Sequence, residues 1–119
     1  MSKRTIVDWL GDILAWGQRL EGHIAGMSYD GFVRDPKTQD AASKCVESIG
    51  LAANEVGKLD PSLVSRSQPQ PSLQGRNKLS HGYYSVELEI VWQTVTDSIP
   101  KTIASAKEAM VALENDASS

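Results

Sequence analysis

Residues 3–25 read KRTIVDWLGDILAWGQRLEGHIA, and this stretch decides the fold class of the chain. Its large apolar side chains return every three or four positions, at Ile6, Trp9, Leu10, Ile13, Leu14, Leu20 and Ile24. That period is typical of an amphipathic helix with one buried face. The stretch therefore predicts a long first helix over about residues 3–25, which Gly26 ends.

A second long helix is expected after a short helical connector at residues 28–32. Asp35-Pro36 is a helix-start signal, because aspartate is a good N-cap and proline fits the first turn. The apolar face that follows consists of Ala42, Cys45, Val46, Ile49, Ala53 and Val56, and the helix is expected to end near Gly57. Small residues on this helix would let a neighbouring helix approach closely.

The helical period then stops and resumes. Residues 61–75 contain three prolines and several Ser and Gln residues, which predicts a loop with at most one short helical piece. A helix from Arg76 to about His81 is expected to stop at Gly82. The period resumes at Leu88, and Pro100 is expected to kink or divide the helix that follows.

The fold class that these patterns predict is all-α, an antiparallel up-and-down helical bundle. The 119 residues fit a single domain over 1–119, with residues 115–119 as a frayed tail. No apolar run approaches the roughly 20 residues that a membrane helix needs. The lone cysteine, Cys45, rules out an internal disulfide, and with no secretory leader in view a cytoplasmic protein is expected.

The chemistry of the chain is concentrated in residues 76–84, which read RNKLSHGYY. Arg76 offers a planar fork of donors that suits a phosphate. His81 can give or take a proton near neutral pH. Tyr83 supplies a phenol that can donate a hydrogen bond, stack on a base or be modified. Together these residues form a compact set for acting on a phosphodiester.

The charge distribution agrees with a local anion site. The net charge is −3, which argues against a generic nucleic-acid binder. Between Asp60 and Glu87, however, there is no acidic residue, while Arg66, Arg76 and Lys78 are basic. Attraction to an RNA backbone would therefore be local and modest.

Helix geometry limits how these residues can act. Arg76 and His81 are five residues apart, so on a regular helix they point about 140° apart with a rise of about 7.5 Å. Either the helix ends near Gly82 and lets His81 swing, or two copies of the helix meet across a two-fold axis. Taken alone, an arginine and a histidine at this spacing also suit an ordinary solvated helix end.

The longer segment that contains these residues allows a more specific interpretation. Residues 76–95, RNKLSHGYYSVELEIVWQTV, resemble the HepT-like toxins of the HEPN superfamily, whose hallmark is Arg-x4-His-x-Tyr followed by an acidic-aliphatic-Trp stretch. Residues 26–32, 37–41 and 47–53 are similar to the family's first interhelical segment and second long helix. The resemblance covers about residues 3–113.

The resemblance implies a metal-independent endoribonuclease that needs no cofactor and acts as a homodimer on RNA. It assigns catalysis to Arg76 and His81, and supporting roles to Asn77 and Tyr83. It further implies a partner, an MNT-type nucleotidyltransferase antitoxin that transfers AMP from ATP to Tyr83. The alternative is a non-catalytic HEPN module that binds RNA, nucleotide or such a partner.

The remaining reactive side chains have structural interpretations. Asp8 and Asp12 are spaced like a carboxylate pair, but a solvated helix face is the expected role. His23 has no metal-spaced partner, and Cys45 falls on an apolar stripe. The sequence contains neither a glycine-rich phosphate loop nor a paired Cys/His metal signature.

Overall fold

The computed structural model describes residues 4–64 and 84–118, and all regular structure in these ranges is helical. The elements in chain order are α1 (Ile6–Ile24), α2 (Tyr29–Val33), α3 (Pro36–Leu59), η1 (Pro61–Val64), α5 (Tyr84–Gln93), η2 (Thr94–Ser98) and α6 (Ile99–Ser118). The four longer helices pack together, which confirms the all-α prediction.

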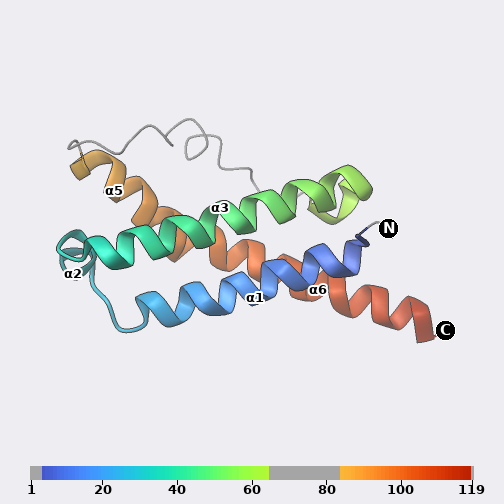
Figure 1. Cartoon of the computed structure of the whole chain (residues 1–119). Helices are drawn as coiled ribbons and strands as arrows, with labels where there is room; N and C mark the ends of the chain where they lie inside the picture. The colour runs from blue at the N-terminus through green and yellow to red at the C-terminus, as the bar shows by residue number, and fades with distance from the viewer. Residues whose placement is uncertain (1–3, 65–83, 119) are drawn as a thin grey trace.

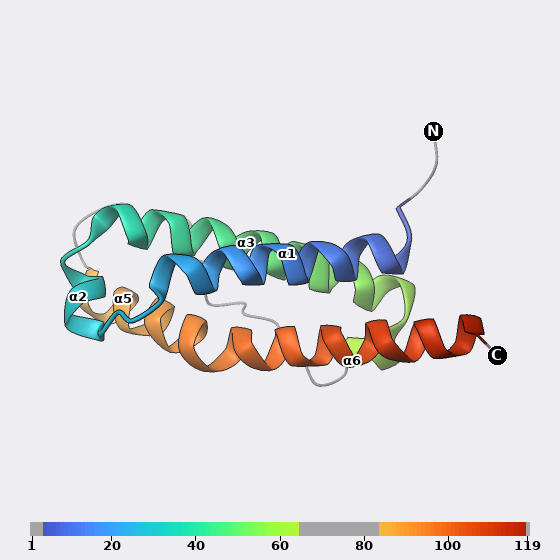
Figure 2. The same cartoon turned by 90° about the horizontal axis from the view of Figure 1, so that it is seen from below.

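The three longest helices form the body of the molecule. α1 packs against both α3 and α6 and runs antiparallel to them (Figures 1 and 2). α3 and α6 run in the same direction, so the strict alternation expected of an up-and-down bundle does not extend to this pair. The reason is connectivity: the chain leaves α3 at one end of the bundle and re-enters it through α5 at the other end.

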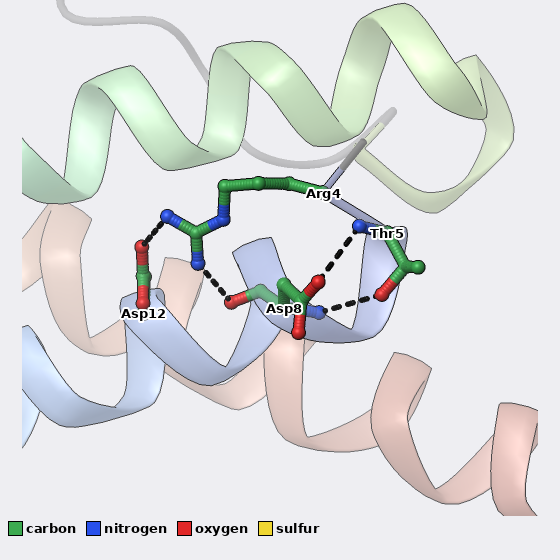
Figure 3. Close-up of polar contacts among 4 residues, drawn as sticks. All are labelled: Arg4, Thr5, Asp8 and Asp12. Atoms are coloured by element: carbon green, nitrogen blue, oxygen red, sulfur yellow. Dashed lines mark hydrogen bonds and ion pairs between the residues drawn. The ribbon is translucent and has the colours of Figure 1, made fainter. Parts of the chain in front are cut away.

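α1 begins with side chains that satisfy its first backbone groups (Figure 3). Thr5 Oγ1 accepts a hydrogen bond from the Asp8 backbone N–H at 3.1 Å, and Asp8 Oδ2 accepts one from the Thr5 N–H at 2.9 Å. These bonds hold the pKa of Asp8 below its usual value. The Arg4 guanidinium forms an ion pair with Asp12 Oδ2 at 2.9 Å and donates a hydrogen bond to the Asp8 carbonyl at 3.2 Å. The carboxylates of Asp8 and Asp12 therefore both interact with residues at the N-terminal end of α1.

The connections between helices follow the expected signals. Gly26 has φ +72°, the left-handed conformation that glycine adopts without strain after a helix. Ser28 caps α2, and Asp35 caps α3 with Pro36 in the first turn. Asp35 accepts bonds from the Thr38 N–H at 3.1 Å and from Thr38 Oγ1 at 2.8 Å.

These bonds to Thr38 lower the pKa of the Asp35 carboxyl, which gives a pH prediction. The folded pKa lies below the unfolded one, so the contribution to stability is present above the unfolded pKa and is lost as pH falls through the folded pKa. Asp35→Asn keeps an acceptor but removes the titrating charge. We expect wild type to melt above Asp35→Asn at neutral pH, with the difference in Tm shrinking in acid. A difference that does not vary with pH would contradict this account.

The core lies where the periodicity predicted it. Leu10, Ile13, Ile49 and Val56 are almost completely buried between α1 and α3, and Phe32 of α2 is fully buried. α6 adds Ile99, Ile103, Ala106 and Ala109 to the same cluster. Burial of apolar area is the main favourable term in folding, so these faces stabilise the arrangement of the three long helices.

Gly17 marks a close approach of α1 to α6. A Cβ built on Gly17 would lie 2.6 Å from Ile103 Cδ1 and 2.8 Å from Ile103 Cγ1. We expect Gly17→Ala to lower the free energy of unfolding by about 1–2 kcal/mol, the net of overpacking and improved helix propensity. Urea unfolding of wild type and Gly17→Ala measures this change in the free energy of unfolding.

Gly11, on the same helix, provides the matched control. A Cβ there meets nothing within 4 Å, so Gly11→Ala is expected to stabilise the protein by about 0.5–1 kcal/mol. In an Ile103→Ala background, Gly17→Ala should no longer lower the free energy of unfolding, because the clashing side chain is gone. Equal effects of the two glycine substitutions in wild type would show that close packing at Gly17 does not matter.

The C-terminal half agrees with one expectation and departs from another. The helical run is divided just before Pro100, as expected, because η2 is a π-helical turn over Thr94–Ser98 and α6 starts at Ile99. The tail expected from residue 115 is helical up to Ser118. In the ranges that the structure describes, no helix combines the length and apolar character needed to cross a bilayer.

Candidate functional site

The residues singled out by the sequence, Arg76, Asn77, His81 and Tyr83, lie outside the described residues. The same holds for Gly82, for most of the predicted loop at 61–75 and for the predicted helix at 76–81. η1, at Pro61–Val64, is the short helical piece expected in that loop. The structure describes the elements on either side of this segment.

Those elements lie at opposite ends of the bundle. η1 follows α3 directly at one end, while α5 lies at the other end, where it contacts α2 (Figure 1). Because α5 starts at Tyr84, the residue before it in the chain is Tyr83. The C-terminal side of the Arg-His-Tyr run is thus attached to the α2 end of the bundle.

α5 is held at this end by an aromatic cluster. The Trp92 ring packs against Phe32 with a centroid distance of 5.1 Å and against Tyr29 at 6.2 Å, both tilted. Such tilted arrangements are favoured by the charge distribution of aromatic rings. Trp92 is therefore a packing residue, and its partners are the two aromatic side chains of α2.

Two carboxylates of α5 have different environments. Glu87, in the first turn, is half-buried and its Oε1 atom is shielded from solvent, whereas Glu89 is exposed. Shielding a carboxylate oxygen from water is costly unless polar or cationic groups face it. Glu87 also ends the acid-free stretch of the sequence. Glu87, the acidic residue nearest to Tyr83 in the sequence, is therefore partly buried on α5.

The join between α5 and α6 is irregular. In η2 the Ile99 N–H donates to the Thr94 carbonyl, five residues back, as in a π-helix. Thr94 Oγ1 donates to the Ile90 carbonyl at 2.8 Å, and Thr96 Oγ1 to the Trp92 carbonyl at 2.7 Å. Pro100 follows with no N–H to donate. Side-chain hydroxyls thus supplement a backbone ladder that is interrupted between the two helices.

Other reactive side chains of the described part have structural roles. Burial raises the pKa of the Cys45 thiol, so it is an inert core residue. His23 is exposed in the last turn of α1. The Arg4 guanidinium lies 4.2 Å from the centre of the Trp9 ring, and Arg19 lies 4.4 Å from that of Trp16. Within residues 4–64 and 84–118 no group of three metal-binding side chains is present.

Comparison with known proteins shows what the chain as a whole is similar to. The family description Ribonuclease HepT-like matches residues 13–109, a range that includes the whole Arg-His-Tyr run. A probable ribonuclease HepT of Thermococcus cleftensis is 31% identical over 102 residues, which cover 82% of this chain and 89% of that protein.

Two further relatives are similar over most of their length. A Methanocaldococcus jannaschii protein named as a putative RNase is 29% identical over 120 residues, covering 98% of this chain and 96% of its own. A protein of the same description from Caldanaerobacter subterraneus is 31% identical over 103 residues, 86% of this chain and 91% of its own. No solved structure matches the chain.

Proposed function

Because this chain belongs to the Ribonuclease HepT-like family, we propose that it is a metal-independent endoribonuclease and the toxin of a HEPN/MNT toxin–antitoxin pair. The observation that carries the proposal is the complete run Arg76-x4-His81-x-Tyr83 inside the matched residues 13–109. The names of the relatives point to the same activity class.

The proposed chemistry uses the nucleophile that RNA itself carries. The 2′-hydroxyl loses its proton to a His81 imidazole, and its oxygen bonds to the adjacent phosphorus. The bond from phosphorus to the 5′-oxygen breaks, and that oxygen is protonated as it leaves. The products are a 2′,3′-cyclic phosphate and a 5′-hydroxyl. Arg76 holds the phosphate and stabilises its growing negative charge, while Asn77 orients His81 or bonds a phosphate oxygen.

A homodimer supplies both proton transfers. One imidazole cannot readily accept the 2′-proton and donate another at the same time, so His81 of the partner subunit is the proposed acid. A small domain has little room for a deep private cleft.

The proposed antitoxin is an MNT-type nucleotidyltransferase that silences the site covalently. The Tyr83 oxygen attacks the α-phosphorus of ATP, the bond to the β-phosphate oxygen breaks, and pyrophosphate leaves while the phenolic proton goes to a base. The attached AMP brings a phosphate beside Arg76, where it competes with the phosphate of the substrate.

Incubation of pure protein with labelled RNA in EDTA tests the proposed activity. Cleavage that leaves a 2′,3′-cyclic phosphate and a 5′-hydroxyl is the expected result, because no step uses a metal. RNA that stays intact would instead support the non-catalytic interaction module. His81→Ala discriminates between the two functions, because a ribonuclease that uses His81 should lose cleavage in this variant.

A further inference from the structure

The attachment of α5 to the bundle is the feature from which we draw a further inference. α5 follows Tyr83 directly, and its main described contact beyond its own helical run is with α2. Trp92 makes this contact through its ring pairs with Phe32, which is fully buried, and with Tyr29, which is half-buried. The C-terminal end of α5 is thus located by a tertiary contact.

The join to α6 does not locate α5 as firmly. A regular α-helix running from α5 into α6 would fix the direction of α5 by its hydrogen-bond ladder alone. η2 replaces that ladder with a π-helical turn, and Pro100 removes one of its donors. Thr94 and Thr96 donate back to carbonyls one turn earlier, an arrangement that tends to bend helices.

We infer that Trp92 is a positioning residue of the proposed ribonuclease: its packing on Tyr29 and Phe32 anchors the end of α5 and so sets the direction of the helix to which Tyr83 is joined. The inference rests on the proposed function. A displacement of about 1 Å in a catalytic group can cost about 100-fold in rate, so a contact made nine residues after Tyr83 can control turnover without touching RNA.

Trp16 provides a matched control. It is a half-buried tryptophan that packs against the same core, but from α1, where the Arg19 guanidinium lies over its ring. Trp92→Leu and Trp16→Leu each remove an indole and keep an apolar side chain. A purely structural role of Trp92 would make the two variants alike once their stabilities are matched.

The experiment compares kcat, KM and Tm for wild type, Trp92→Leu, Trp92→Phe and Trp16→Leu, with a labelled RNA in EDTA below all melting temperatures. We expect Trp92→Leu to lose about 10- to 100-fold, mainly in kcat, whereas Trp16→Leu stays within about threefold. Trp92→Phe keeps an aromatic ring against α2 and should recover most of the rate. Tyr29→Leu removes the half-buried partner ring and replaces Trp92→Leu in the comparison if that variant does not fold.

The outcomes separate the two proposals. If wild type cleaves RNA but the α2–α5 variants lose no more kcat than Trp16→Leu, the positioning role is wrong and the ribonuclease stands. A loss of rate that Trp92→Phe does not recover also overturns the role of ring packing. If wild type does not cleave, the proposed function fails first, and the positioning role falls with it.

Discussion

His81→Ala is expected to lower the rate of RNA cleavage in EDTA by about 10²- to 10⁴-fold, the usual contribution of a positioned acid or base. In the proposed homodimer the substitution removes both imidazoles of the shared site at once, so the upper part of this range is expected. The measurement is the single-turnover rate of cleavage of a labelled RNA, with protein in excess.

The chain contains its own control for this experiment. His23 is the other of its two histidines, and it is exposed on α1. His23→Ala should cleave at the wild-type rate and melt at a similar temperature. Wild-type cleavage by His81→Ala, or an equal loss in both variants, would remove His81 from catalysis. It would leave the family membership untouched.

Adenylylation of Tyr83 is expected to have the second-largest effect. Incubation with the nucleotidyltransferase partner and ATP should raise the intact mass by whole AMP groups and lower cleavage by about 100-fold or more, because Arg76 then faces a competing phosphate. Mass spectrometry before and after the reaction measures the first effect, and the cleavage assay in EDTA measures the second.

The neighbouring phenol serves as the control for this modification. Tyr84→Phe should be modified and silenced like wild type, whereas Tyr83→Phe should gain no mass and stay insensitive to the partner. An adduct that persists in Tyr83→Phe would place the acceptor elsewhere. A modified protein that cleaves RNA at the wild-type rate would show that the adduct does not block the site.

The site itself was predictable only as a pattern in the chain. Arg76, His81 and Tyr83 have side chains that suit phosphate binding, proton transfer and modification, and their spacing is the most specific part of the resemblance to the HepT-like family. What the structure adds is the position of the helix that follows the motif: α5 begins at Tyr84 and packs on α2 at one end of the bundle.

The sequence by itself determined the helices, their caps and the buried faces. Asp35 with Pro36, Gly26 and the apolar period of residues 3–25 act through bonds and contacts within a few positions, so they can be read locally. Only the tertiary structure decided that α3 and α6 run in the same direction, that Gly17 meets Ile103, and that Trp92 packs on Tyr29 and Phe32. These features join residues far apart in the chain, and an apolar period specifies that a face is buried without specifying which partner buries it.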